Sequence, residues 1–160
     1  MVRPGQALSE ARWFVHQVEE ASFPVQSDKK SSYITPCELL ALVVALRLWS
    51  SDLRQGRIDL CLTPDSDSLC ACFASQRWYS ASQNLARVLK ELSLLCLQES
   101  VSVCPRHLPG NQNVLADGIS RRYPEIINLF SPKNQCAVLP HHMFVLPRAE
   151  EPPDPGESWQ

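Results

Sequence analysis

The stretch from Thr35 to Leu53, TPCELLALVVALRLWSSDL, restricts the possible folds of this chain more than any other segment. Thr35 stands where a helix N-cap is expected, Pro36 at the first helical position and Glu38 at the third. The residues that follow are nearly free of charge and contain no helix breaker. A helix that is apolar on most of its surface must be covered by other elements. The stretch therefore predicts a mostly buried helix.

Strand and helix patterns alternate along the rest of the chain. Aromatic, β-branched or alternating apolar residues predict strands at 12–18, 22–26, 57–63 and 101–107. Capped or periodic segments predict helices at 68–76, from Ser80 or Ser82 to about Cys96, and at 113–120, where Asn113 is the expected cap. This order indicates an α/β fold in which helices flank a mixed sheet.

Length and charge narrow the class of protein further. The 160 residues are 44% hydrophobic and 20% charged, which is ordinary for one globular domain. We expect this domain over residues 1–130 and a disordered, proline-rich tail over 131–160. The net charge of -2 does not favour nucleic-acid binding by the whole chain, so such binding needs a local basic patch. No segment resembles a membrane span or a signal peptide, and we expect a cytoplasmic or nuclear protein.

The seven cysteines contain no C-x-x-C pair, and several lie in apolar runs such as LSLLCLQ. A thiol in such a run behaves as a small hydrophobic group. The pattern therefore predicts buried free thiols and gives little support to a zinc site or a disulfide framework.

Three carboxylates fall where an α/β architecture gathers functional side chains. Glu38 lies at the start of the long helix, Asp65 directly follows a strand, and Asp117 lies in the helix after the turn LPGNQ. Clustered carboxylates suit hard divalent cations such as Mg²⁺ or Mn²⁺. Two such ions can activate water and stabilise the leaving oxygen at a phosphodiester. The three side chains are therefore candidate metal ligands.

Structural alternatives exist for these residues. Glu38 could complete a capping box with Thr35, and Asp65 competes with Asp67, either of which could be only a helix cap. Near the amphipathic helix, Trp78 and Tyr79 could lie against a nucleic-acid substrate or anchor the core.

Three segments together resemble a known family. TPCELLALVVAL carries Glu38, LTPDSDSLCACF carries Asp65, and RHLPGNQNVLADGISR fills the pattern H-x-P-G-x-x-N-x-x-A-D-x-x-S-R without a gap. From about Arg12 to Tyr123 the chain is similar to the ribonuclease H domain of retroelement reverse transcriptases, especially those of gypsy-type and DIRS-type elements. The resemblance implies a ribonuclease-H-like fold that hydrolyses the RNA strand of RNA–DNA hybrids by two-metal catalysis.

The resemblance also implies roles for single residues. Glu38, Asp65 and Asp117 would be catalytic ligands of Mg²⁺ or Mn²⁺, and His107 would assist product release as a further catalytic residue. A lone histidine at a strand end has a structural or solvated alternative. Nucleic-acid contacts are expected from Arg106, Asn113 and Arg121, and the alternative for the arginines is scattered surface charge. The partners would be an RNA–DNA hybrid and the reverse transcriptase domain of the same polyprotein.

The chain departs from the family pattern at its start. Family members carry a further aspartate on an opening strand, in a D-A-S-x-x-G-x-G setting, and counting back from Glu38 this strand would fall at or before Met1. We therefore expect an N-terminally truncated domain with weak or no activity, and self-association through an exposed sheet edge. The alternative is a catalytically inactive remnant that binds nucleic acid or protein, and a third class is an interaction module that uses the proline-rich tail.

Overall fold

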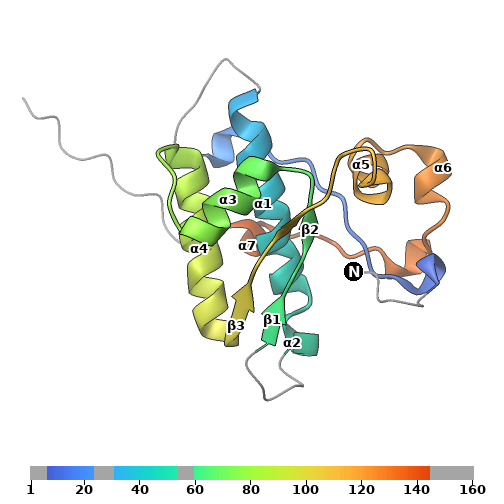
Figure 1. Cartoon of the computed structure of the whole chain (residues 1–160). Helices are drawn as coiled ribbons and strands as arrows, with labels where there is room; N and C mark the ends of the chain where they lie inside the picture. Colours follow the sequence, from blue (N-terminus) through green and yellow to red (C-terminus); the bar gives the residue numbers. More distant parts are fainter. Residues whose placement is uncertain (1–6, 24–30, 54–59, 145–160) are drawn as a thin grey trace, which may run out of the picture.

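The computed structural model of this chain describes residues 7–23, 31–53 and 60–144. It is a mixed α/β structure, mostly helical, with small two-stranded parallel sheets (Figure 1). The α-helices are α1 (Ser31–Leu48), α2 (Ser50–Leu53), α3 (Leu69–Arg77), α4 (Gln83–Glu99), α5 (Val114–Ser120), α6 (Pro124–Ile127) and α7 (Pro140–Met143). The strands are β1 (Leu60–Leu62), β2 (Asp65–Ser66), β3 (Val101–Val103) and β4 (Arg106–His107), and the 3-10 helices are η1 (Leu8–Glu10), η2 (Glu20–Ser22) and η3 (Pro132–Asn134).

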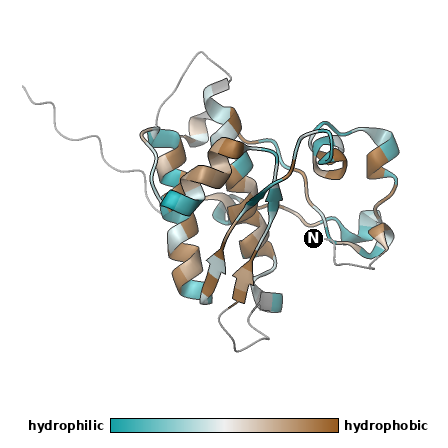
Figure 2. Ribbon diagram, in the orientation of Figure 1, coloured by the Kyte–Doolittle hydropathy of each residue, from teal (hydrophilic) through white to brown (hydrophobic). Residues whose placement is uncertain are grey.

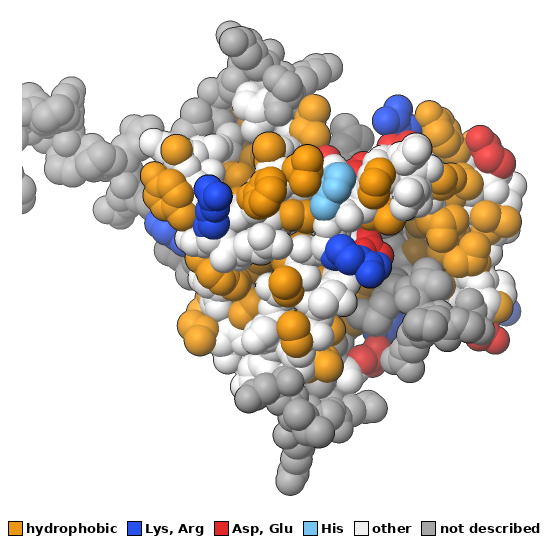
Figure 3. Space-filling model, in the orientation of Figure 1, with side chains coloured by type: hydrophobic (Ala, Val, Ile, Leu, Met, Phe, Trp, Pro, Cys, Tyr) orange, Lys and Arg blue, Asp and Glu red, His pale blue; other side chains and the backbone are white. Residues whose placement is uncertain are grey.

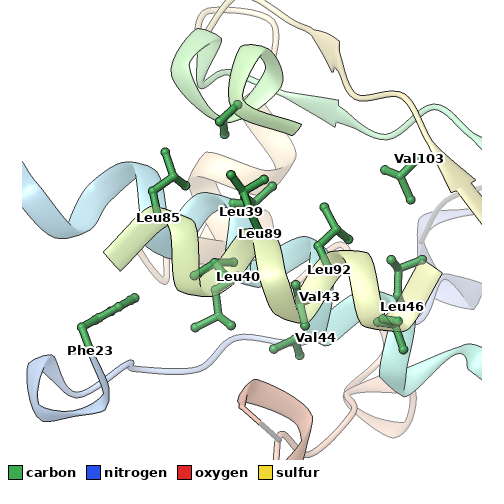
Figure 4. Close-up of a cluster of buried hydrophobic side chains, with 14 of the residues drawn as sticks. Phe23, Leu39, Leu40, Val43, Val44, Leu46, Leu85, Leu89, Leu92 and Val103 are labelled. Atoms are coloured by element: carbon green, nitrogen blue, oxygen red, sulfur yellow. The ribbon is translucent and has the colours of Figure 1, made fainter. Parts of the chain in front are cut away.

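Helices α1 and α4 pack against each other and form the main hydrophobic core (Figure 4). Both helices place apolar side chains at intervals of three and four residues, so that one stripe of each faces the other. The buried side chains are Leu39, Leu40, Val43, Val44 and Leu46 of α1 and Leu85, Val88, Leu89, Leu92 and Leu95 of α4. Figure 2 shows hydrophobic and hydrophilic residues alternating around α4. The predicted buried helix and the predicted amphipathic helix are both confirmed.

The hydroxyls of Ser68 and Ser82 cap α3 and α4. The Ser82 hydroxyl accepts from the Leu85 amide at 3.4 Å, which selects Ser82 over Ser80 as the cap of α4. Asn113 holds the N-cap position of α5 but makes no side-chain capping bond. The predicted start of α1 at Thr35 was wrong, because this helix begins at Ser31 and contains Pro36 in its interior.

The earlier start of α1 has a packing reason. Tyr33 is buried, and its ring lies 5.5 Å from the ring of Phe23, centroid to centroid. Burying this aromatic ring favours an additional helical turn before Thr35. Pro36 costs the helix one backbone hydrogen bond near its beginning, which is a smaller penalty than in a central turn. Thr35 is therefore a helical residue, and the predicted capping box with Glu38 does not form.

The two strand pairs belong to one interrupted ladder. β1 pairs with β3 and β2 pairs with β4, both in parallel, and partner residues are 41 positions apart in both pairs. The amides of Cys104 and Arg106 donate to the carbonyls of Leu62 and Pro64, each at 2.8 Å. Pro64 has no amide hydrogen with which to continue the pattern, so the ladder breaks at this residue and resumes at Asp65. The strands expected around 57–63 and 101–107 are thus found, although 57–59 lie outside the described residues.

One face of this ladder packs on the helices and the other face is open. Val101, Val103 and Pro105 are buried, whereas Ser102, Cys104 and Arg106 between them are exposed. Figure 1 shows β1 and β3 in front of the helices that cover their inner face. The ladder in the described residues is only two strands wide and wholly parallel, so the expected mixed sheet is not seen there. Polar groups on the open face are therefore accessible.

The strand predicted at 12–18 is not formed. A single parallel bridge joins Trp13 to Gln135, in which the Trp13 amide donates to Asn134 O at 3.2 Å and the Cys136 amide donates to Trp13 O at 2.7 Å. Phe14 lies 6.0 Å from the ring of Trp49 instead of facing a partner strand. The aromatic residues that suggested a strand serve here as separate packing anchors. In the segment predicted at 22–26, Ser22 ends η2, and 24–26 lie outside the described residues.

A second, smaller hydrophobic cluster holds the N-terminal segment against the region of α5 and α6. Its buried members are Ala11, Trp13 and Phe130, and half-buried Leu8, Val15, Leu115, Ile119, Ile126 and Ile127 pack around them. The Trp13 indole donates to the carbonyl of Ser131 at 3.0 Å. Figure 1 shows this part of the chain beside the larger helical body.

Residues 131–144, which the sequence assigns to a disordered tail, are built into this structure. They form η3 and α7, and Val138, Met143 and Phe144 pack against the main core. The apolar residues between the prolines supply this packing. Residues 145–160 lie outside the described residues.

The thiols are less buried than expected. Cys72 is buried, Cys37, Cys96 and Cys136 are half-buried, and Cys61, Cys70 and Cys104 are exposed. All seven cysteines are free. Across the part of the chain that the structure describes, no helix combines the length and apolar character needed to cross a membrane.

Candidate nucleic-acid and metal site

Glu38 lies half-buried in α1, where it faces the beginning of α3. Its carboxylate accepts a hydrogen bond from the Ser68 hydroxyl, and that hydroxyl also accepts from the Ala71 amide at 3.2 Å as the cap of α3. Burial raises the pKa of Glu38, the bond from Ser68 opposes this shift, and the negative charge of Asp67 adds to it. Glu38 therefore joins α1 to α3 as a partly desolvated carboxylate.

Asp65 occupies the open face of the ladder and is held by an arginine. Arg106 Nε lies 2.7 Å from Asp65 Oδ1 and Arg106 Nη2 lies 3.1 Å from Asp65 Oδ2, across the pairing of β2 with β4. This two-pronged contact lowers the pKa of Asp65 and raises the pKa of Arg106. Both side chains are exposed, so the pair contributes little to stability.

Asp117 is also paired with an arginine. Arg121, which directly follows α5 one turn after Asp117, places its Nε 2.7 Å from Asp117 Oδ1. Hydrogen bonds from Arg121 to Asp117 and Tyr123 raise the pKa of the guanidinium. Two of the three predicted metal ligands are thus neutralised by arginines that were expected to contact nucleic acid.

The turn between β4 and α5 brings the segment RHLPGNQNVLADGISR close to the segment LTPDSDSLCACF. His107 is exposed and pairs in register with Ser66, and the Leu108 amide donates to Ser66 O at 2.9 Å. A Cβ atom on Gly110 would lie 3.9 Å from Asp67 Oδ2, so the turn passes close to that carboxylate. The half-buried Asn113 follows this turn.

The structure therefore joins the three motif segments through specific contacts. The Glu38 segment touches the Asp65 segment through Ser68, and the Asp65 segment pairs with the His107 segment through Ser66. Asp67, rather than Asp65, is the acidic neighbour that acts on Glu38. The sequence named Asp65 as the ligand with Asp67 as its competitor, and the structure pairs Asp65 with Arg106 and places Asp67 near Glu38.

These positions do not by themselves make a metal centre. Within residues 7–23, 31–53 and 60–144, no group of three or more His, Cys, Asp or Glu side chains is placed to hold a metal ion. Asp65 and Asp117 each face a guanidinium, and burial favours the protonated form of Glu38. Binding of Mg²⁺ or Mn²⁺ thus stays a prediction.

Replacing Glu38 with glutamine is expected to stabilise the protein near neutral pH. The folded state raises the pKa of Glu38, so the folded chain holds this proton more tightly than the unfolded chain. Stability therefore falls as pH rises from the ordinary glutamate pKa through the raised value. Glutamine keeps a polar partner for Ser68 and avoids the cost of a buried charge.

The melting temperatures of the wild type and Glu38→Gln should be compared at about pH 7 and about pH 4. The variant should melt higher at the first pH, and the difference should shrink at the second. Glu125→Gln, which changes an exposed glutamate of α6, is the matched control. A melting temperature of Glu38→Gln at or below the wild type near neutral pH would contradict this account.

Comparison of the chain with protein-family models, with curated proteins and with solved structures finds no match in any of the three.

Proposed function

We propose that this chain is a ribonuclease-H-like domain of a retroelement polyprotein, and that it binds RNA–DNA hybrids with weak or no hydrolysis of its own. The observation that carries the proposal is the meeting of three motif segments that lie far apart in the sequence. Glu38 contacts Ser68, and Ser66 pairs with His107, so the three segments meet where the parallel strands end. Ligand sites of α/β proteins commonly lie at this end of the strands.

The hybrid would lie on the open face formed by β4 and α5. Arg106 and Arg121 are mostly exposed; Arg106 precedes the turn that leads to Asn113, and Arg121 directly follows α5. Guanidinium groups bind phosphate oxygens in the same forked geometry in which they bind carboxylates. A phosphate backbone would therefore compete with Asp65 and Asp117 for these two side chains. Exposed ion pairs are weak enough for such an exchange.

The ion pairs of Asp65 and Asp117 with arginines favour a second candidate function. Hydrolysis by two metal ions requires carboxylates that are free to hold the ions. Asp65 and Asp117 are instead engaged by Arg106 and Arg121. A catalytically inactive remnant that binds the hybrid without cutting it is consistent with this arrangement. The reverse transcriptase domain of the same polyprotein stays the proposed protein partner in either case.

Neutralising the carboxylates is expected to strengthen hybrid binding. Asp65→Asn and Asp117→Asn should each tighten binding of a labelled RNA–DNA hybrid by about threefold to fivefold at low salt, because each frees an arginine and removes a repulsive charge. Arg106→Gln and Arg121→Gln should each weaken binding. Each should also reduce the slope of log binding constant against log salt concentration by about one, because one phosphate contact is lost. Fluorescence anisotropy of the hybrid without divalent metal measures both effects.

The same variants separate binding from cleavage. Addition of Mg²⁺ or Mn²⁺ to the labelled hybrid should give little or no cleavage by the wild type. If the wild type cleaves the hybrid and Asp117→Asn abolishes this cleavage, the domain is catalytic and the proposal of an inactive remnant is rejected. A wild-type protein that does not bind the hybrid at low salt, or aspartate variants that bind it more weakly, would overturn the proposed binding face.

A further inference from the structure

Helix α3 carries exposed aromatic side chains on the side that faces away from the core. Ala71, Cys72, Ala74 and Ser75 are its buried residues. Phe73 is 53% exposed, and after the helix ends Trp78 is 46% and Tyr79 72% exposed. Leu69, one turn before Phe73, is also exposed. We call Leu69, Phe73, Arg77, Trp78 and Tyr79 the α3 aromatic surface. The sequence allowed two roles for Trp78 and Tyr79, contact with a substrate or anchoring in the core. Both side chains are exposed, so neither is a buried core anchor.

The backbone at Trp78 adds an independent observation. This residue ends α3 in the left-handed region, with φ 53° and ψ 31°. Glycine is the usual residue in this conformation, and a bulky side chain there is uncommon and strained. Full burial of the side chain does not offset this strain, because nearly half of Trp78 is exposed to solvent. Strained residues of this kind cluster at functional sites.

The charge of the surface indicates the kind of ligand. The Arg77 guanidinium carbon lies 6.0 Å from the centre of the Phe73 ring. From Ser68 to Lys90 the sequence contains no aspartate or glutamate, and the exposed cations of this segment are Arg77 and Lys90, because Arg87 is half-buried against the Phe144 ring. Figure 3 shows hydrophobic side chains and Lys or Arg side chains together over the region where Figure 1 draws α3. A polyanion would meet no acidic side chain along this segment.

We infer that the α3 aromatic surface binds single-stranded nucleic acid by stacking unpaired bases on Phe73, Trp78 and Tyr79 while Arg77 contacts the backbone. Every base presents a flat π-face, and exposed aromatic rings interleaved with cationic groups are the usual platform for it. A purely apolar protein partner would not exploit the cation beside Phe73. This site uses other side chains than Arg106 and Arg121 and does not depend on hybrid binding.

The test measures binding of a fluorescently labelled oligothymidine to the full chain by anisotropy. Trp78→Leu and Tyr79→Leu keep an apolar side chain and remove the ring, and each should weaken binding roughly tenfold. Trp78→Phe keeps a stacking ring and should retain most of the affinity. Leu97→Ala, which removes an exposed apolar side chain of α4, is the matched control and should bind like the wild type.

A glycine variant distinguishes lost stacking from lost folding. Trp78→Gly relieves the left-handed backbone, so it should melt no lower than the wild type while binding as weakly as Trp78→Leu. Equal affinities of Trp78→Leu and the wild type, or an equal loss in Leu97→Ala, would overturn the inference. Loss of oligothymidine binding in these variants with hybrid binding unchanged would support it. Failure of Arg106→Gln to affect the hybrid would count only against the proposed hybrid face.

Discussion

Replacing Glu91 with alanine is expected to lower the free energy of unfolding by about 3–5 kcal/mol. Glu91 is fully buried in α4, and its Oε2 lies 2.6 Å from Arg47 Nη2 of α1. Only a tenth of the Arg47 side chain is exposed, so the substitution leaves a buried cation without its counter-charge. Arg47 Nη1 also donates to the carbonyls of His142 and Met143, at 3.2 and 2.8 Å. The loss should therefore reach α7 as well as the contact between α1 and α4.

Urea unfolding of the wild type and the variant measures this effect. The double variant Arg47→Met, Glu91→Leu is the informative control, because it removes both charges and keeps apolar volume between the helices. We expect it to be clearly more stable than Glu91→Ala, although it still lacks the bonds from Arg47 to α7. A double variant as unstable as the single one would contradict this account, because removing the unpaired charge would then have restored no stability.

Replacing Gly118 with alanine is expected to cost about 1–3 kcal/mol of stability. Gly118 is buried in α5, and a Cβ atom there would lie 2.5 Å from Cγ1 of Ile126 and 2.9 Å from its Cβ and Cγ2. These atoms belong to a branched side chain held in the second hydrophobic cluster, so they cannot move away freely. The higher helix propensity of alanine offsets only part of this overlap.

Thermal or urea unfolding should show the loss, and a second substitution tests its cause. Ile126→Ala removes Cγ1 and Cγ2, two of the three atoms that Gly118→Ala would meet, so the double variant should be destabilised by less than the two single losses together. Additive losses would indicate that the contact with Ile126 is not responsible.

The parts of the fold that follow from local sequence were predictable. The amphipathic spacing of α4, together with Ser82, determines its face and its start, because both depend on residues within a few turns. The beginning of α1 depends on Tyr33 packing against Phe23, and no local pattern contains that contact. Likewise, the aromatic residues around Trp13 fit a strand or a set of anchors equally well, and contacts more than a hundred positions along the chain select the anchors.

The candidate site was predictable in its residue types but not in its pairings. Which aspartate faces Glu38 depends on the register of β2 with β4, because that register brings Arg106 to Asp65 and leaves Asp67 beside Glu38. Similarly, the neutralisation of Asp117 depends on the rotamer of Arg121, one helical turn away. Sequence patterns give the order of such groups, whereas their electrostatic partners arise only in the folded state.

The 41-residue separation within the parallel ladder has a consequence for the order of folding. A parallel pair cannot close through a tight turn, so the crossover that contains α3 and α4 must become compact before the strands can meet. Helices form from neighbouring residues and assemble fast, whereas distant strand pairing is slow. The proposed binding face is thus completed late, and a nascent chain that has not yet emerged past His107 lacks the strand that unites its motifs.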